Sequence, residues 1–72
     1  MLKGMDRLYW DDAYAVALAL IERYPDIDPL TVAWETLHCW VVQLPDFADD
    51  PDLKHLGWLR DIQKEWYEEV CS

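Results

Sequence analysis

Apolar side chains recur along this chain at the spacing of one helical face. The first such stretch ends at Pro25 and contains Ala13, Val16, Ala17, Leu20, Ile21 and Tyr24. The second spans residues 35–44, ends before Pro45 and contains Leu37, Trp40, Val41 and Leu44. The third lies near the end of the chain and contains Leu59, Ile62, Trp66 and Val70. Because proline disfavours helix in the residue before it, the pattern predicts three helices, two of them bounded by proline.

Two Asp-Pro pairs predict helix starts, because an aspartate N-cap accepts an orphan backbone N–H and proline at the first helical position has none to lose. Asp28-Pro29 predicts a short helical turn through Thr31 and Val32. Asp50-Pro51 predicts the start of the last helix. No alternation of period two is long enough for a confident strand, although residues 32–34 could pair locally. The expected fold is mainly α, a small helical domain that resembles a modified winged-helix or helix-turn-helix arrangement.

The size of the chain predicts one domain. Its 72 residues form a single unit with a core from about 10 to 70 and an N-terminal extension over residues 1–9. A chain this short buries only about 60% of its unfolded surface. The five tryptophans and 53% hydrophobic content supply core material nonetheless, because aromatic side chains cover much area per residue.

Charge excludes the function that the helix-turn-helix resemblance would suggest. The would-be recognition helix, from Glu35 to Leu44, contains no Lys or Arg, which bidentate reading of guanine requires. The whole chain has six basic against fifteen acidic residues and a net charge of -9. Nucleic acid and anionic membranes are therefore poor partners, and cations or a basic protein are favoured.

The remaining sequence features favour a cytoplasmic location. No stretch approaches the roughly 20 apolar residues that span a bilayer, and the first residues do not form a secretory signal. Cys39 and Cys71 lie far apart and form no disulfide framework. We expect Cys39 to be a half-buried small hydrophobe. His38 and Cys39 are neighbours on a helix and point about 100° apart, so they predict no nucleophile–base pair and we expect no enzymatic activity.

The acids are distributed unevenly. Between Arg23 and Lys54 the chain has no basic residue and seven acids, Asp26, Asp28, Glu35, Asp46, Asp49, Asp50 and Asp52. Such a run is usually only a solvated face. Here it accompanies aromatic and apolar residues, which favours a contact surface.

The first predicted helix has apolar residues outside its core stripe. Tyr14 and Leu18 lie off that stripe, and no charged residue occurs from Ala13 to Ile21. A helix that is apolar all round buries more than one face. Weak self-association through Tyr14 and Leu18 and an enlarged partner contact are two explanations, and a wider core that includes Trp10 and Trp58 is the third.

Three segments resemble the signature blocks of the IscX family, small acidic proteins encoded with the bacterial iron–sulfur cluster assembly machinery. They are Tyr24-Pro25-Asp26-Ile27-Asp28-Pro29, Leu37-His38-Cys39-Trp40 and Asp46-Phe47-Ala48-Asp49-Asp50-Pro51. The resemblance runs from Trp10 to the last helix at the family's own spacing. It implies a modified winged-helix-like domain that does not bind DNA.

The resemblance also implies partners and site residues. Family members bind cysteine desulfurase through an acidic face, against a basic patch near its active site, compete with frataxin for that surface, and regulate cluster assembly. Carried over to this chain, the partner-binding residues are Asp26, Glu35, Asp46, Asp49, Asp50 and Asp52, with Phe47 as an apolar anchor if it is exposed. Phe47 turned inward is the other interpretation. No cofactor is expected to bind tightly, but weak ferrous iron is implied at Asp46, Asp49 and Asp50.

Departures from the family pattern bear on iron more than on docking. Where the family has further acids, this chain has Thr36, Gln43, Pro45 and Ala48. A hard cation needs several converging oxygen ligands, so each lost carboxylate weakens the site, whereas docking spreads over a surface. Two other functions stay open: an iron-binding metallochaperone that uses the same carboxylates, and an acidic mimic of nucleic acid.

Overall fold

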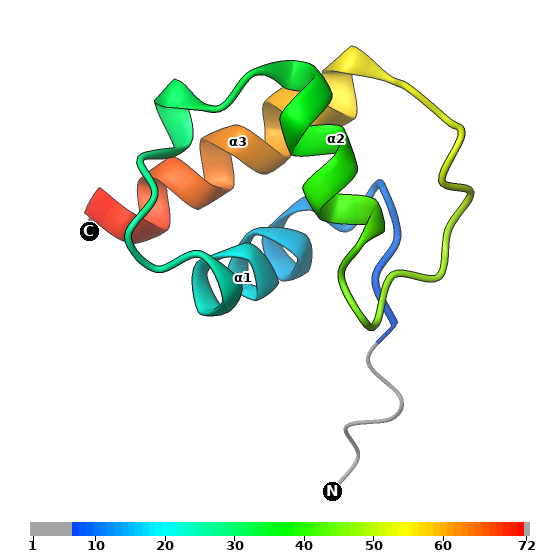
Figure 1. The fold of residues 1–72 in the computed structure, drawn as a ribbon, viewed down its shortest axis with the longest axis horizontal. Helices are drawn as coiled ribbons and strands as arrows, with labels where there is room; N and C mark the ends of the chain where they lie inside the picture. Colours follow the sequence, from blue (N-terminus) through cyan, green and yellow to red (C-terminus); the bar gives the residue numbers. More distant parts are fainter. Residues whose placement is uncertain (1–6, 72) are drawn as a thin grey trace, which may run out of the picture.

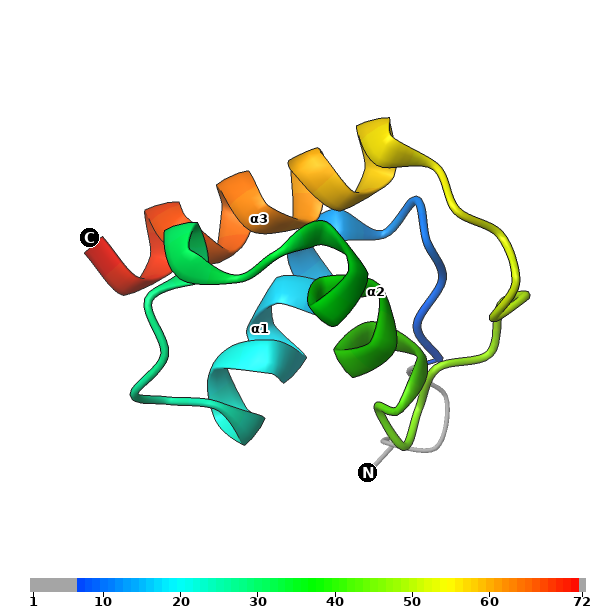
Figure 2. The same cartoon turned by 45° about the horizontal axis from the view of Figure 1, so that its top comes forward.

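The computed structural model describes residues 7–71, which form three α-helices and one 3₁₀ turn (Figure 1). The elements are α1 (Ala13–Arg23), η2 (Pro29–Thr31), α2 (Trp34–Val42) and α3 (Leu56–Cys71). Figure 2 shows α3 lying across α1 and α2, and its most extensive packing is against α1. The mainly α class is confirmed. The described residues contain no strand beyond an isolated parallel bridge between Leu8 and Phe47, so the comparison with a winged helix is not confirmed.

The first helix forms where the apolar spacing predicts it. Val16, Ala17 and Leu20 are fully buried on one face of α1. The helix ends as expected before Pro25, and the N–H of Tyr24 makes the last helical bond to the carbonyl of Leu20 at 2.7 Å.

The first Asp-Pro pair also behaves as predicted. The Oδ1 of Asp28 accepts the N–H of Leu30 at 3.0 Å, and Pro29 is the first residue of η2. Thr31 donates its hydroxyl to the carbonyl of Asp28 at 2.7 Å. Local strand pairing over residues 32–34 does not occur, because Trp34 begins α2.

The second Asp-Pro pair does not start a helix, so that prediction was wrong. The Oδ1 of Asp50 accepts the N–H of Asp52 at 2.9 Å, which is the same local bond that Asp28 makes. The chain nevertheless forms only a turn, and α3 begins at Leu56. The carbonyl of Asp50 accepts the backbone N–H of Leu53 at 3.3 Å, which closes the turn, and also the indole N–H of Trp10 at 2.8 Å. The local Asp-Pro signal thus gives a turn held by a tertiary contact rather than the start of α3.

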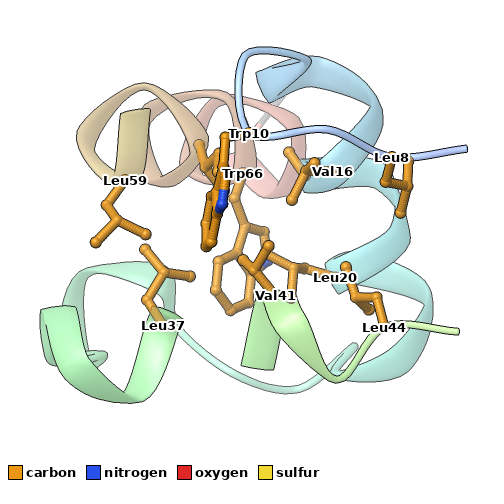
Figure 3. Close-up of a cluster of buried hydrophobic side chains, with 11 residues drawn as sticks. Leu8, Trp10, Val16, Leu20, Leu37, Val41, Leu44, Leu59 and Trp66 are labelled. Atoms are coloured by element: carbon orange, nitrogen blue, oxygen red, sulfur yellow. The ribbon is translucent and has the colours of Figure 1, made fainter. Parts of the chain in front are cut away.

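The core is built from all three helices and from the segment before α1. Figure 3 shows Trp10 and Trp66 between the helices, surrounded by aliphatic side chains, and both indoles are at most 1% exposed. Leu8 is also buried, so the core reaches into residues 1–9, which the sequence predicted as an extension; residues 1–6 lie outside the described part. Val70 is 42% exposed, so the predicted stripe of α3 ends at Trp66.

Alanine substitutions at two leucines of α1, one buried and one exposed, test this packing. Leu20→Ala removes a side chain with no exposed surface and should lower the free energy of unfolding by about 2–5 kcal/mol. Leu18→Ala truncates a side chain that is 39% exposed and should change it by less than about 1 kcal/mol. Urea denaturation followed by circular dichroism measures both; equal losses would contradict the placement of α1.

Candidate functional site

The candidate site is built around residues 43–55, which join α2 to α3 and which we call the acidic loop (Figure 1). The segment before α1 holds the first half of this loop. The N–H of Leu8 donates to the carbonyl of Asp46, and the N–H of Ala48 donates to the carbonyl of Leu8, both at 2.9 Å. The Leu8–Phe47 bridge therefore fixes the backbone next to the aspartates.

Trp10 binds the acidic loop at two further points. Its backbone N–H donates to the Oδ2 of Asp49 at 3.0 Å, and its indole Nε1–H donates to the carbonyl of Asp50 at 2.8 Å. The ring of Phe47 packs edge-on against the indole, with ring centroids 5.0 Å apart. Phe47 is half-buried against the core, which matches the inward interpretation rather than an exposed anchor.

His38 joins the second half of the loop to α2. Its ring is buried and stacks on Trp10 at a centroid distance of 5.1 Å, and its Nε2 lies 3.1 Å from the carbonyl oxygen of Leu53. Because a carbonyl oxygen can only accept, Nε2 carries the hydrogen. His38 is thus a core-edge residue that positions the loop.

The four loop aspartates differ in what their carboxylates do. Asp49 accepts the N–H of Trp10 through Oδ2 and that of Asp50 through Oδ1, at 3.0 and 2.7 Å. Asp50 accepts the N–H of Asp52. Asp46 and Asp52 are exposed, and their carboxylates form no hydrogen bond or ion pair with the rest of residues 7–71. These two carboxylates are the ones available to a partner.

The other predicted partner-binding acids lie outside the loop. Glu35 is exposed in the first turn of α2. Asp26 is exposed in the turn between α1 and η2, and Figures 1 and 2 both show that turn on the side of the molecule opposite the acidic loop. The structure therefore does not gather all predicted residues on one face, and their partner-binding roles stay predictions.

The predicted iron ligands do not form a ready-made site. Within the described range 7–71, no group of three or more histidine, cysteine, aspartate or glutamate residues is placed to hold a metal ion. Both oxygens of Asp49 already accept backbone N–H groups. Weak ferrous binding at Asp46, Asp49 and Asp50 stays a prediction.

An open groove of about 450 Å³ lies between the starts of α2 and α3, next to the acidic loop. It is lined mainly by apolar side chains, and its lining residues are Trp34, Glu35, His38, Cys39, Lys54, Leu56 and Leu59. Sequence reasoning missed this groove, because it placed residues 51–56 in the first turns of the last helix. The signal in the sequence is the pair Leu53 and Leu56, which flank Lys54 outside the stripe of α3.

The two cysteines lie at different places on the surface. Cys39 is exposed in the groove, so its prediction as a half-buried residue was wrong. Cys71 is exposed at the end of α3. A hydrogen bond with Cys71 raises the pKa of the Tyr67 phenol above its ordinary value, with smaller effects from the charge of Cys71, burial and Asp28.

Tyr14 and Leu18 of α1 do not extend the core, although Trp10 is part of it and Trp58 packs against it. Tyr14 is 52% exposed and Leu18 is 39% exposed. Self-association or an enlarged partner contact through them stays a prediction. None of the helices in residues 7–71 is long and apolar enough to cross a membrane.

Comparison with known proteins gives two findings. A family model described as iron-sulphur cluster assembly matches residues 8–71. An uncharacterized protein of Pseudomonas aeruginosa is 42% identical over 62 residues, covering 86% of this chain and 94% of the relative. The match begins at residue 8, where the structure first shows a buried side chain.

Alanine substitutions at two loop aspartates should distinguish a carboxylate that stabilises the loop from one that makes no bond within residues 7–71. Asp49→Ala leaves the N–H groups of Trp10 and Asp50 without their acceptor and should lower the free energy of unfolding by about 1–3 kcal/mol. Asp52→Ala removes a carboxylate that makes no such bond and should change it by less than about 0.5 kcal/mol. Urea denaturation at one pH measures both variants. If Asp49→Ala were as stable as Asp52→Ala, the hydrogen bonds that Asp49 accepts would contribute nothing measurable to stability.

Proposed function

We propose, from the premise that this chain belongs to the iron–sulphur cluster assembly family, which is the IscX family, that it is a non-catalytic regulator that docks on cysteine desulfurase. Family membership indicates a role in cluster assembly. The partner, the regulation and the absence of catalysis are the proposed part. The observation that carries the proposal is a pair of exposed carboxylates on an anchored acidic loop, those of Asp46 and Asp52, which make no hydrogen bond or ion pair with the other described residues.

Net charge supports a basic partner. The chain carries a net charge of -9, and the loop contributes four aspartates against a single lysine, Lys54. Oppositely charged surfaces speed diffusional encounter at low salt and reject partners of like charge. A basic patch on the desulfurase is the complement that such a surface requires.

The anchoring of the loop also supports docking. The bonds from Leu8, Trp10 and His38 hold the backbone on both sides of the aspartates. A loop that is already ordered loses less conformational entropy on binding, so more of the interaction free energy appears as affinity. The proposed mechanism is occupancy: the bound domain blocks frataxin and sulfur acceptors from the same basic surface.

The two alternative functions have less support. A metallochaperone would need converging carboxylates, and the described residues contain no group of three ligands placed for a metal. Anaerobic calorimetric titration with ferrous iron tests it, because carboxylate-dependent uptake is expected only of a ligand site. An acidic mimic of nucleic acid would need carboxylates repeated along a line, whereas the acids of this chain lie on opposite sides of the fold.

Charge-reversal variants test where the partner docks. Asp46→Lys combined with Asp52→Lys should weaken binding to cysteine desulfurase by at least about tenfold at low salt and flatten its salt dependence. Asp61→Lys combined with Glu68→Lys changes net charge equally on exposed positions of α3 and should weaken binding much less. Fluorescence anisotropy at several salt concentrations measures both.

The α3 double variant is the control that distinguishes docking at the acidic loop from a general effect of net charge. Equal weakening by the two double variants would show that only net charge matters and would contradict a dock at the loop. Unchanged affinity of the loop variant at low salt would contradict electrostatic docking altogether.

A further inference from the structure

Exposed apolar side chains gather where the groove opens. Trp34 and Leu56 both line it and are 37% and 52% exposed. Leu53, which directly precedes the lining residue Lys54, is a further exposed leucine at 42%. Single exposed leucines are ordinary on protein surfaces. Several around one hollow form the kind of surface that another molecule covers.

The charges around the groove favour a basic partner that reaches it. Glu35 lies in the lining, and Asp52, with its unengaged carboxylate, precedes the lining residue Lys54 by two positions. Among the described residues that line the groove, Lys54 is the one lysine or arginine, and the charge of Glu35 balances its charge. The rest of the acidic loop adds three more aspartates. A molecule drawn to the loop by positive charge is therefore delivered to the edge of an apolar hollow.

We infer that the groove receives an apolar side chain that protrudes from the basic surface of the partner. The inference rests on the proposed function and deepens it by dividing the docking surface into two parts. The loop carboxylates contact basic residues, and the lining formed by Trp34, Leu56 and Leu59 contacts one branched aliphatic or aromatic side chain. The aliphatic stem of Lys54 extends the apolar lining while its ammonium group stays in water.

Its volume distinguishes this groove from the exposed pair on α1, Tyr14 and Leu18. Tyr14 and Leu18 offer two side chains, whereas the groove offers a hollow of about 450 Å³, within the range of cavities that take a whole side chain or small ligand. Interface residues that fill pockets carry most of the binding energy. The α1 pair is the competing location in the experiment.

The two exposed cysteines allow the partner's contact surface to be mapped by alkylation, without any substitution. Cys39 lies in the groove and Cys71 at the end of α3, and both are exposed. Alkylation of the wild-type chain with iodoacetamide, with and without excess purified cysteine desulfurase, is followed at each cysteine by mass spectrometry. We expect the partner to slow alkylation of Cys39 by at least about fivefold and to leave Cys71 within about twofold.

Two matched leucine variants test the energetics. Leu56→Ser alters the first residue of α3, 52% exposed, and Leu18→Ser alters a 39% exposed residue of α1. We expect Leu56→Ser to raise the Kd for cysteine desulfurase about tenfold at both low and high salt, because salt does not screen an apolar contact. We expect Leu18→Ser to change it less than twofold. Circular dichroism confirms that each variant folds, and Trp34→Ala provides a second change in the lining.

The outcomes separate this inference from the proposed function. If the wild-type chain binds desulfurase but neither Cys39 nor the two lining variants respond, the inference is overturned and the proposed function stands. If Leu18→Ser weakens binding and Leu56→Ser does not, the apolar contact lies on α1 and the inference is again overturned. If the wild-type chain does not bind at low salt, both are overturned.

Discussion

The rest of this structure depends on the hydrogen bond that the indole of Trp10 donates and on the ring contacts that it makes. A buried tryptophan needs a partner for its Nε1–H, and here the carbonyl of Asp50 supplies it from forty residues further along the chain. The same residue stacks on His38 and packs against Phe47. Trp66 provides the contrast, since its buried Nε1 has no hydrogen-bond partner within the described residues. Trp66 is held by packing, whereas Trp10 also fixes the course of a loop.

That loop is unfavourable by composition, because four aspartates within seven positions repel one another. The structure reduces the cost by giving two of the carboxylates backbone N–H donors. Asp49 accepts two and Asp50 accepts one, and hydrogen bonds to ionised acceptors are among the stronger ones. The other two, Asp46 and Asp52, point their charge to solvent. The four aspartates therefore fall into two pairs: one pair binds the backbone of the loop, and the other pair is open to solvent.

The helices could be predicted from the sequence because their signal is local and repeated, as Leu20 of α1 and Leu37 of α2 show. The start of α3 could not. Asp28 and Asp50 each bond the N–H two residues on through the side chain and the N–H three residues on through the carbonyl, yet α3 begins only at Leu56. The loop before α3 is held by the bonds that Trp10 and His38 donate to the carbonyls of Asp50 and Leu53. Such distant contacts leave no mark in the local pattern. The groove was missed for the same reason, since it exists only because α3 begins at Leu56. The acidic residues predicted to bind a partner were chosen by counting charge. Counting cannot separate Asp49, whose carboxylate accepts two backbone N–H groups, from Asp52, whose carboxylate makes no hydrogen bond or ion pair within residues 7–71.

The division between loop and groove has a kinetic consequence for the proposed docking. Long-range attraction from Asp46 and Asp52 acts before contact and mainly raises the association rate, whereas an apolar side chain in the groove acts only after contact and mainly lowers the dissociation rate. A regulator that competes for a shared surface needs fast arrival, and it also needs a bound lifetime that can be set independently. Different side chains allow this, because the carboxylates of Asp46 and Asp52 lie outside the groove lining, whereas Trp34, Leu56 and Leu59 belong to it. Substitutions in the groove should then change how long the complex lasts without altering how quickly it forms.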